Sequence, residues 1–224
     1  LTVSVADLLQ QTASEREAHA AAVRARLQEL HEQLQVRFPI YVLVTKTDLL
    51  AGFEAFFAPL GKEERAQVWG TTFAHREDGT LPLSDFGAEF DALQQRLIDR
   101  VLERMHAERD PAQRAAIHAF PQQFGNLKGL LGDFLDKVFA ASKFEQAPLL
   151  RGVYFTSGTQ EGSPIDRVMG TLARSLGLER KLVAPAAASG RSYFITTLLR
   201  QVIFAEQGLA GTNLRWERRA AILT

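Results

Sequence analysis

The sequence contains no cysteine, so it can form neither a disulfide framework nor a thiol-based active site. It also lacks an excess of charge, because 26 basic residues balance 26 acidic residues among the 224. A neutral chain gives no support for general nucleic-acid binding, which needs a basic surface. No apolar run reaches the ~18 residues of a membrane-spanning helix. The composition, 46% hydrophobic and 23% charged, is that of a globular protein.

Several familiar catalytic motifs are missing as well. The histidines form no i,i+4 pair and no H-E-x-x-H motif, which argues against a zinc site. No G-x-S-x-G nucleophile elbow surrounds Ser157. No G-x-x-x-x-G-K-[ST] phosphate-binding loop occurs, and the nearest glycine–lysine pairing, in residues 125–129, lacks its spacing. Because phosphoryl transfer relies on that loop for positioning and charge stabilisation, we expect no nucleotide hydrolysis by this chain alone.

The first part of the chain has the pattern of a strand, a helix and a second strand. Leu1 to Val5 alternates apolar and small polar residues, which predicts a strand. Ser14 and Glu17 have the spacing of a capping box, and the helix that follows is expected to run to about Arg37. Residues 40–44 are continuously apolar, as expected for a strand buried on both faces. This order predicts two parallel strands joined by a crossover, and since the chain opens inside a strand, we expect earlier strands upstream.

The middle of the chain is predicted to be helical. A short helix is expected over residues 53–57, and residues 70–83 are rich in loop formers. Apolar residues from Phe86 to Met105 have helical spacing, Pro111 follows a capping Asp110, and a further helix is marked between residues 127 and 138. These helices together are too long for an ordinary crossover, so we interpret them as an inserted lobe.

The last part begins with a strand at residues 152–156. Ser163-Pro164 is expected to start a helix, residues 184–190 form a small-residue linker, and residues 192–204 are expected to be a last amphipathic helix. The chain then divides into an α/β core of residues 1–84 and 151–183, a helical lobe of residues 85–150, and a linker with a C-terminal helical extension over residues 184–224.

Two loops are predicted to leave the carboxyl ends of neighbouring strands, where ligands bind in parallel sheets. The first, Thr45-Lys46-Thr47-Asp48, matches the [N/T]-K-x-D motif of GTPases. In that motif the aspartate accepts two hydrogen bonds from guanine, and the aliphatic part of the lysine covers the base. The second loop begins at Ser157-Gly158, where a backbone N–H would contact the guanine carbonyl. The candidate nucleotide-binding residues are therefore Thr45, Lys46, Asp48, Ser157 and Gly158.

Each of these features also has a simpler interpretation. Asp48 can cap the next helix while Lys46 is solvated, and Ser157-Gly158 is a common turn sequence. A cluster of large aromatic residues can be either a partner-binding patch or part of the core: Phe53, Phe56, Phe57 and Trp69. Three arginines can flank a membrane on its cytoplasmic side or end a solvated helix: Arg215, Arg218 and Arg219.

Residues 39–73, 151–168 and 193–213 resemble, in this order, segments of the IcmF/TssM family of type VI secretion proteins. The resemblance implies a large inner-membrane protein with a GTPase-like cytoplasmic domain, whose phosphate-binding loop would lie before Leu1. Lys46 and Asp48 would then read the base and Ser157 would supply the backbone contact. Thr45 departs from the commoner asparagine of GTPases.

The fold class that follows is α/β: a partial P-loop-GTPase-like parallel sheet with a large inserted helical lobe and a C-terminal helical extension toward a membrane helix. This chain alone would hold no cofactor, whereas GTP or ATP with Mg²⁺ would bind the parent protein.

Two functions remain open. We favour a scaffold at the cytoplasmic face of the bacterial inner membrane that docks other membrane-complex and baseplate subunits and no nucleic acid, using the helical lobe and the 15 phenylalanines as partner surface. The alternative is the base-recognition half of a switch that hydrolyses GTP or ATP.

Overall fold

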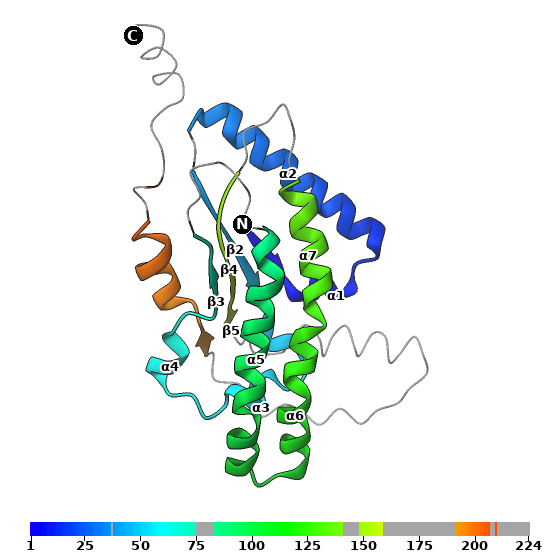
Figure 1. The fold of residues 1–224 in the computed structure, drawn as a ribbon, viewed down its shortest axis with the longest axis vertical. Coiled ribbons are helices and arrows are strands. Elements are labelled where there is room, and N and C mark those ends of the chain that lie inside the picture. The colour runs from blue at the N-terminus through cyan, green and yellow to red at the C-terminus, as the bar shows by residue number, and fades with distance from the viewer. Residues whose placement is uncertain (37, 75–82, 141–147, 159–190, 207–208, 210–224) are drawn as a thin grey trace, which may run out of the picture.

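The computed structural model describes residues 1–36, 38–74, 83–140, 148–158, 191–206 and 209. A small sheet lies between a layer of helices on one face and a short helical segment on the other (Figure 1). The elements in chain order are β1 (Thr2–Ser4), α1 (Val5–Gln10), α2 (Ala13–Leu34), β2 (Pro39–Thr45), η1 (Thr47–Leu49), α3 (Phe53–Phe57), α4 (Lys62–Ala66), β3 (Gly70–Thr72), α5 (Leu83–Ala107), α6 (Pro111–Gly125), α7 (Leu127–Val138), β4 (Leu149–Phe155), β5 (Ser157–Gly158), β6 (Ser192–Tyr193) and η2 (Leu198–Ile203).

The main sheet has the strand order β1-β2-β4-β3, in which β1, β2 and β4 are parallel. The α/β class and the parallel pairing of the first two strands are thereby confirmed. Strand β3 was not expected, because residues 70–83 were interpreted as loop. It is an antiparallel edge strand of three residues, and its sequence begins with Gly70. These residues form a strand only because they pair with β4, about eighty residues later in the chain. A pairing so distant leaves no pattern in the local sequence, so it could not be predicted from it.

The two helices predicted from apolar spacing are present as α5 and α7, and the helix predicted from Asp110-Pro111 is present as α6. The Asp110 side chain caps α6 by accepting from the Ala112 N–H at 3.0 Å. The cap predicted for α2 is wrong by two residues. Thr12 and Glu15, rather than Ser14 and Glu17, form the capping box, because α1 ends at Gln10 and leaves Thr12 extended at the start of α2.

Other corrections concern helix ends and the last segment. Helix α2 stops at Leu34, where Gln35 adopts a left-handed conformation, and does not reach Arg37. Residues 192–204 do not form one amphipathic helix but a strand, β6, followed by the π-helix η2. The helix expected from Ser163, the linker at residues 184–190 and the arginines near residues 215–219 lie outside the described residues.

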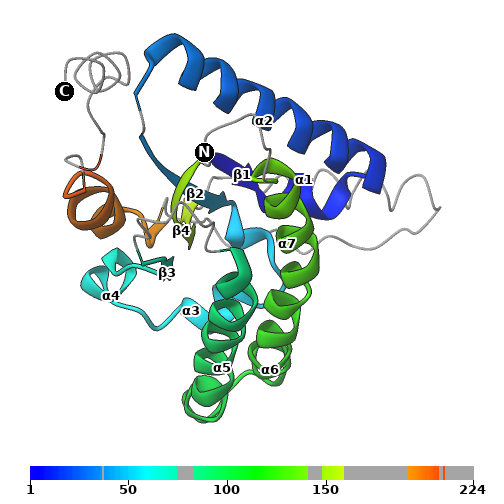
Figure 2. The same cartoon turned by 45° about the horizontal axis from the view of Figure 1, so that its top comes forward.

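Aromatic side chains dominate the core between the sheet and helices α3, α5, α6 and α7. Figure 2 shows the ribbons of these helices on one side of the sheet. Trp69 lies among them, with ring-centroid distances of 5.0 Å to Phe124 and 5.2 Å to Phe155. The cluster considered as a partner patch belongs to this core, since its members are at most 9% exposed: Phe53, Phe56, Phe57 and Trp69. Twelve of the phenylalanines that the structure describes are buried, so these supply core rather than partner surface; of the other described ones, Phe38 is partly buried and Phe204 is 61% exposed.

A substitution at Gly152 tests the close packing of β3 on β4. A Cβ there would lie 2.5 Å from both the Thr71 carbonyl oxygen and the Tyr154 hydroxyl. We expect Gly152→Ala to lower the free energy of unfolding by about 1–3 kcal/mol, because the β3 backbone must move. The measurement is chemical denaturation. Gly129→Ala is the control, since no atom lies within 4 Å of its added Cβ and alanine favours a helix. Equal midpoints for both variants would contradict the packing described here.

Candidate functional site

The two predicted loops lie side by side at the carboxyl ends of β2 and β4. The strands pair with Val44 opposite Phe155, and the Thr156 N–H donates to the Val44 carbonyl at 2.8 Å. The chain therefore leaves both strands at the same level of the sheet. Thr45 remains partly buried, and its hydroxyl donates to the Val3 carbonyl of β1 at 3.4 Å. We call the turns at residues 45–48 and 156–158 the rim.

Thr47 joins the two turns of the rim. Its backbone N–H and its hydroxyl both donate to the Thr156 carbonyl, at 3.3 Å and 3.1 Å, and the residue is fully buried. The preceding Lys46 adopts a left-handed conformation with φ of 59° and is exposed. This backbone reversal lets Thr47 point into the protein while Lys46 stays in solvent.

Asp48 is held by the second turn. The Ser157 hydroxyl donates to Asp48 Oδ1, and Oδ2 has no hydrogen bond to any described residue. Asp48 lies inside η1, and α3 begins later, after Gly52, so the aspartate does not cap that helix. A partly exposed carboxylate oxygen beside an exposed lysine is a suitable acceptor for paired N–H donors of a planar ligand.

The structure thus brings all the sequence-predicted site residues to one rim. Gly158 is exposed and pairs with Ser192 of β6, which the sequence analysis did not anticipate. Among the residues that the structure describes, no group of three or more His, Asp or Glu side chains could hold a metal ion. The rim therefore brings a lysine, a carboxylate and a serine hydroxyl to the carboxyl ends of two parallel strands.

Comparison with known proteins decides the family. The whole chain, residues 1–224, matches the model described as the IcmF-related N-terminal domain. The chain belongs to the IcmF/TssM family. The resemblance seen in the sequence is confirmed. This IcmF/TssM domain is 55% identical over 227 residues to the type VI secretion system component TssM1 of Pseudomonas aeruginosa.

That alignment covers 100% of the present chain but 20% of the relative, so the domain spans about a fifth of a longer homologue. No solved structure matches it. Within the described parts of the chain, none of the helices combines the length and apolar character that crossing a membrane requires.

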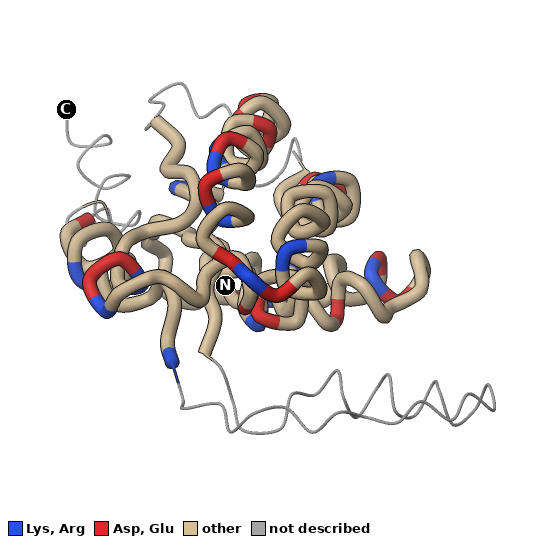
Figure 3. Tube along the Cα trace, turned by 90° about the horizontal axis from the view of Figure 1, so that it is seen from below, with Lys and Arg blue, Asp and Glu red and all other residues tan. Residues whose placement is uncertain are grey.

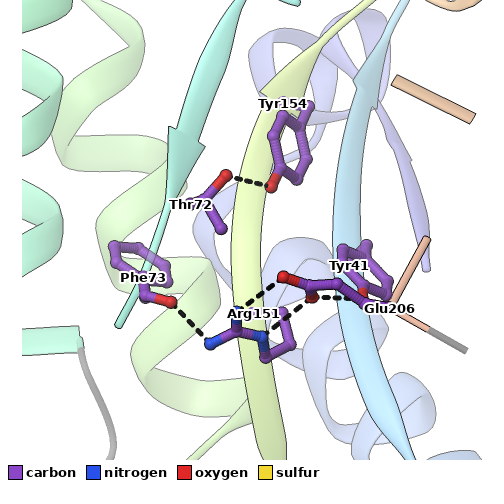
Figure 4. A network of polar contacts seen from close by, with 6 residues as sticks. All are labelled: Tyr41, Thr72, Phe73, Arg151, Tyr154 and Glu206. Atoms are coloured by element: carbon purple, nitrogen blue, oxygen red, sulfur yellow. Dashed lines mark hydrogen bonds and ion pairs between the residues drawn. The ribbon is translucent and has the colours of Figure 1, made fainter. Parts of the chain in front are cut away.

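The IcmF/TssM domain also holds a polar cluster on the outer face of the sheet, away from the aromatic core (Figure 4). Arg151 donates to both carboxylate oxygens of Glu206, at 2.7 Å and 3.0 Å, and to the Phe73 carbonyl at 2.6 Å. The Tyr41 hydroxyl donates to the same carboxylate at 2.6 Å. Thr72 and Tyr154 form a neighbouring hydrogen bond of 2.7 Å. We call Tyr41, Arg151 and Glu206 the latch.

A β-bulge explains why a charged side chain lies in a strand that is buried throughout. The register of β2 and β4 shifts between Ile40 and Tyr41, so Arg151 is the extra residue and shares the outer face with Gly152. Burial, with the hydrogen bond to Glu206 adding to it, raises the pKa of the Tyr41 phenol. The hydrogen bond to Glu206 also raises the pKa of Arg151, so both groups keep their protons in the latch. Sequence reasoning missed the latch; the only local signal was an arginine inside an apolar run.

The hydroxyl of Thr47 can be tested without changing the shape of the side chain. We expect Thr47→Val to lower the free energy of unfolding by about 1 kcal/mol, because a buried hydrogen bond to Thr156 is lost. Thr45→Val is the matched control, and its effect should be smaller because its bond is 3.4 Å long and partly exposed. Chemical denaturation measures both. If Thr47→Val is as stable as the wild type, this hydroxyl does not fix the rim.

Proposed function

We propose that this domain is a scaffold in the cytoplasmic portion of a type VI secretion inner-membrane core component. The support is its 55% identity to a protein named as a component of that system. In this proposal residues 85–150 form a docking lobe, residues 184–224 lead toward a membrane helix, and the domain lies at the cytoplasmic face of the inner membrane. The partners are other membrane-complex and baseplate subunits.

The observation that carries the scaffold proposal is a pair of exposed apolar side chains, Ile98 and Leu102, on α5, which forms a hairpin with α6. The hairpin extends beyond the sheet (Figures 1 and 2). Ile98 and Leu102 lie one turn apart on α5 and are 46% and 69% exposed, whereas Leu93 and Leu97 on the other side are buried. Leu102 is the most exposed large apolar residue in the described chain. Acidic and basic residues are interspersed along the helices seen from below (Figure 3), which favours a protein partner over nucleic acid.

A charge placed on the hairpin tests this surface. We expect Leu102→Glu, alone or with Ile98→Glu, to reduce pull-down of secretion subunits by the full-length protein at least tenfold, because a desolvated carboxylate opposes an apolar contact. Leu34→Glu is the control, since Leu34 is 54% exposed on α2. All variants should retain the wild-type circular dichroism and melting temperature. Unchanged recovery of subunits by Leu102→Glu would remove the hairpin as the docking surface.

A second candidate function is base recognition by a GTPase-like domain of the parent protein. Lys46, Asp48 and Ser157 support it, because a lysine stem, a carboxylate and a serine turn converge at the carboxyl ends of two parallel strands. GTP or ATP with Mg²⁺ would also need the upstream phosphate-binding loop. The scaffold and the nucleotide switch are compatible in one protein.

Base recognition is tested with the complete cytoplasmic domain of the longer protein. We expect Asp48→Asn to weaken GTP binding by about 10- to 100-fold and to improve binding of xanthosine triphosphate. The asparagine amide replaces an acceptor by an N–H donor, which suits the carbonyl that xanthine has in place of the guanine amine. Asp133→Asn, on the exposed side of α7, is the control. Fluorescent-nucleotide titration measures both affinities. An unchanged preference between the two nucleotides would leave Asp48 with a structural role only.

A further inference from the structure

One short segment contacts β4 near both of its ends. Residues 192–206, which we call the strap, begin with β6, where Tyr193 pairs with Ser157 and Ser192 with Gly158. The strap then crosses the outer face of β2 and β4, where Leu198 is fully buried against Tyr41 and Tyr154. It ends on the latch, where Glu206 binds Arg151. Figure 1 shows this segment on the opposite side of the sheet from α5 and α7.

The attachment at the rim is short and strained. The ladder between β5 and β6 has two residues on each strand, so its backbone pairing has little stability of its own. The side chains beside it, Tyr193 and Phe194, are 3% and 5% exposed and pack in the aromatic core. Phe194, directly after β6, has φ of 62°, a conformation that costs free energy for a phenylalanine. Its N–H donates to the Arg65 carbonyl at 2.6 Å. Such a backbone persists only where its surroundings hold it, which here are the aromatic core around Phe194 and the strap that continues after it.

The attachment at the latch is polar and largely removed from solvent. The Arg151 side chain is 9% exposed and that of Glu206 is 23% exposed. A bidentate arginine–carboxylate pair has a defined geometry, and the loss of one partner leaves a buried charge without its counter-ion. Around it the strap makes apolar contacts through Leu198, Val202 and Ile203. Glu206 therefore fixes the position of the strap along the sheet.

We propose that Glu206 is a positioning residue of the rim: by holding the strap on Arg151, it keeps Ser157 and Gly158 paired with β6. An event that releases Glu206 would loosen the Ser157 turn, which holds Asp48. The contacts that dock the strap are made within the chain itself. Any effect of strap docking on nucleotide binding at the rim rests on the base recognition proposed above.

Hydrogen exchange of the complete chain, without nucleotide, tests the docking. In Glu206→Ala we expect exchange to rise about tenfold or more in residues 198–206 and also at residues 157–158, since both attachments weaken together. Amides of the α5–α6 hairpin should not change. Arg200→Ala is the control, because Arg200 is an exposed charge on η2. Tyr41→Phe removes a single hydroxyl from the latch and should give a smaller rise at the same sites, even if Glu206→Ala folds poorly.

The outcomes separate the alternatives. If exchange becomes faster only in residues 198–206, the strap merely covers the outer face of the sheet, and the proposal that Glu206 positions the rim is wrong. No change in either region would overturn the latch itself. A titration of the complete cytoplasmic domain with fluorescent GTP tests whether the docked strap also affects nucleotide affinity. We expect Glu206→Ala to weaken GTP binding several-fold. If the wild-type domain binds no GTP, base recognition fails, while the exchange data still decide whether Glu206 positions the rim.

Discussion

The parallel pairing of β2 with β4 is the constraint on which the fold and the rim depend. With Val44 opposite Phe155, the carbonyl of Thr156 comes within reach of the Thr47 N–H and hydroxyl. A shift by one residue would turn Tyr41 toward the aromatic core and move Val42 to the outer face. Both faces of the sheet therefore select the same register, and that register places the turns of the rim together.

The two faces of these strands are covered in different ways. On the inner face, Trp69 and Phe155 belong to a continuous aromatic core whose burial and ring packing hold the helices on the sheet. On the outer face, the cover is the short η2 helix, and the bulge at Arg151 adds a charge that needs a partner. The inner face thus accounts for most of the apolar burial, and the outer face carries the polar contacts that tie distant segments together.

The sequence predicts those parts whose pattern is local. The apolar run of β2, the turn from Thr45 to Asp48 and the helical spacing of α5 each lie within one stretch of chain, and the structure contains them all. The rim was predictable because parallel strands end at one edge of a sheet. Strand β3 and the latch were not, because each is defined by partners far away in sequence; the Tyr41 hydroxyl, for example, meets Glu206 across 165 positions.

An ion pair as buried as Arg151–Glu206 needs a reason other than stability, because an apolar pair of similar volume often holds a protein together equally well. Apolar contacts alone, however, do not fix where a helix lies along a smooth surface. The contacts of Leu198 and Val202 with Tyr41 and Tyr154 are apolar, and apolar burial has no preferred direction. The bidentate geometry admits one position only, since any other leaves a buried guanidinium without its carboxylate. The pair therefore specifies the docked position of the strap, and through β6 that position extends to the rim.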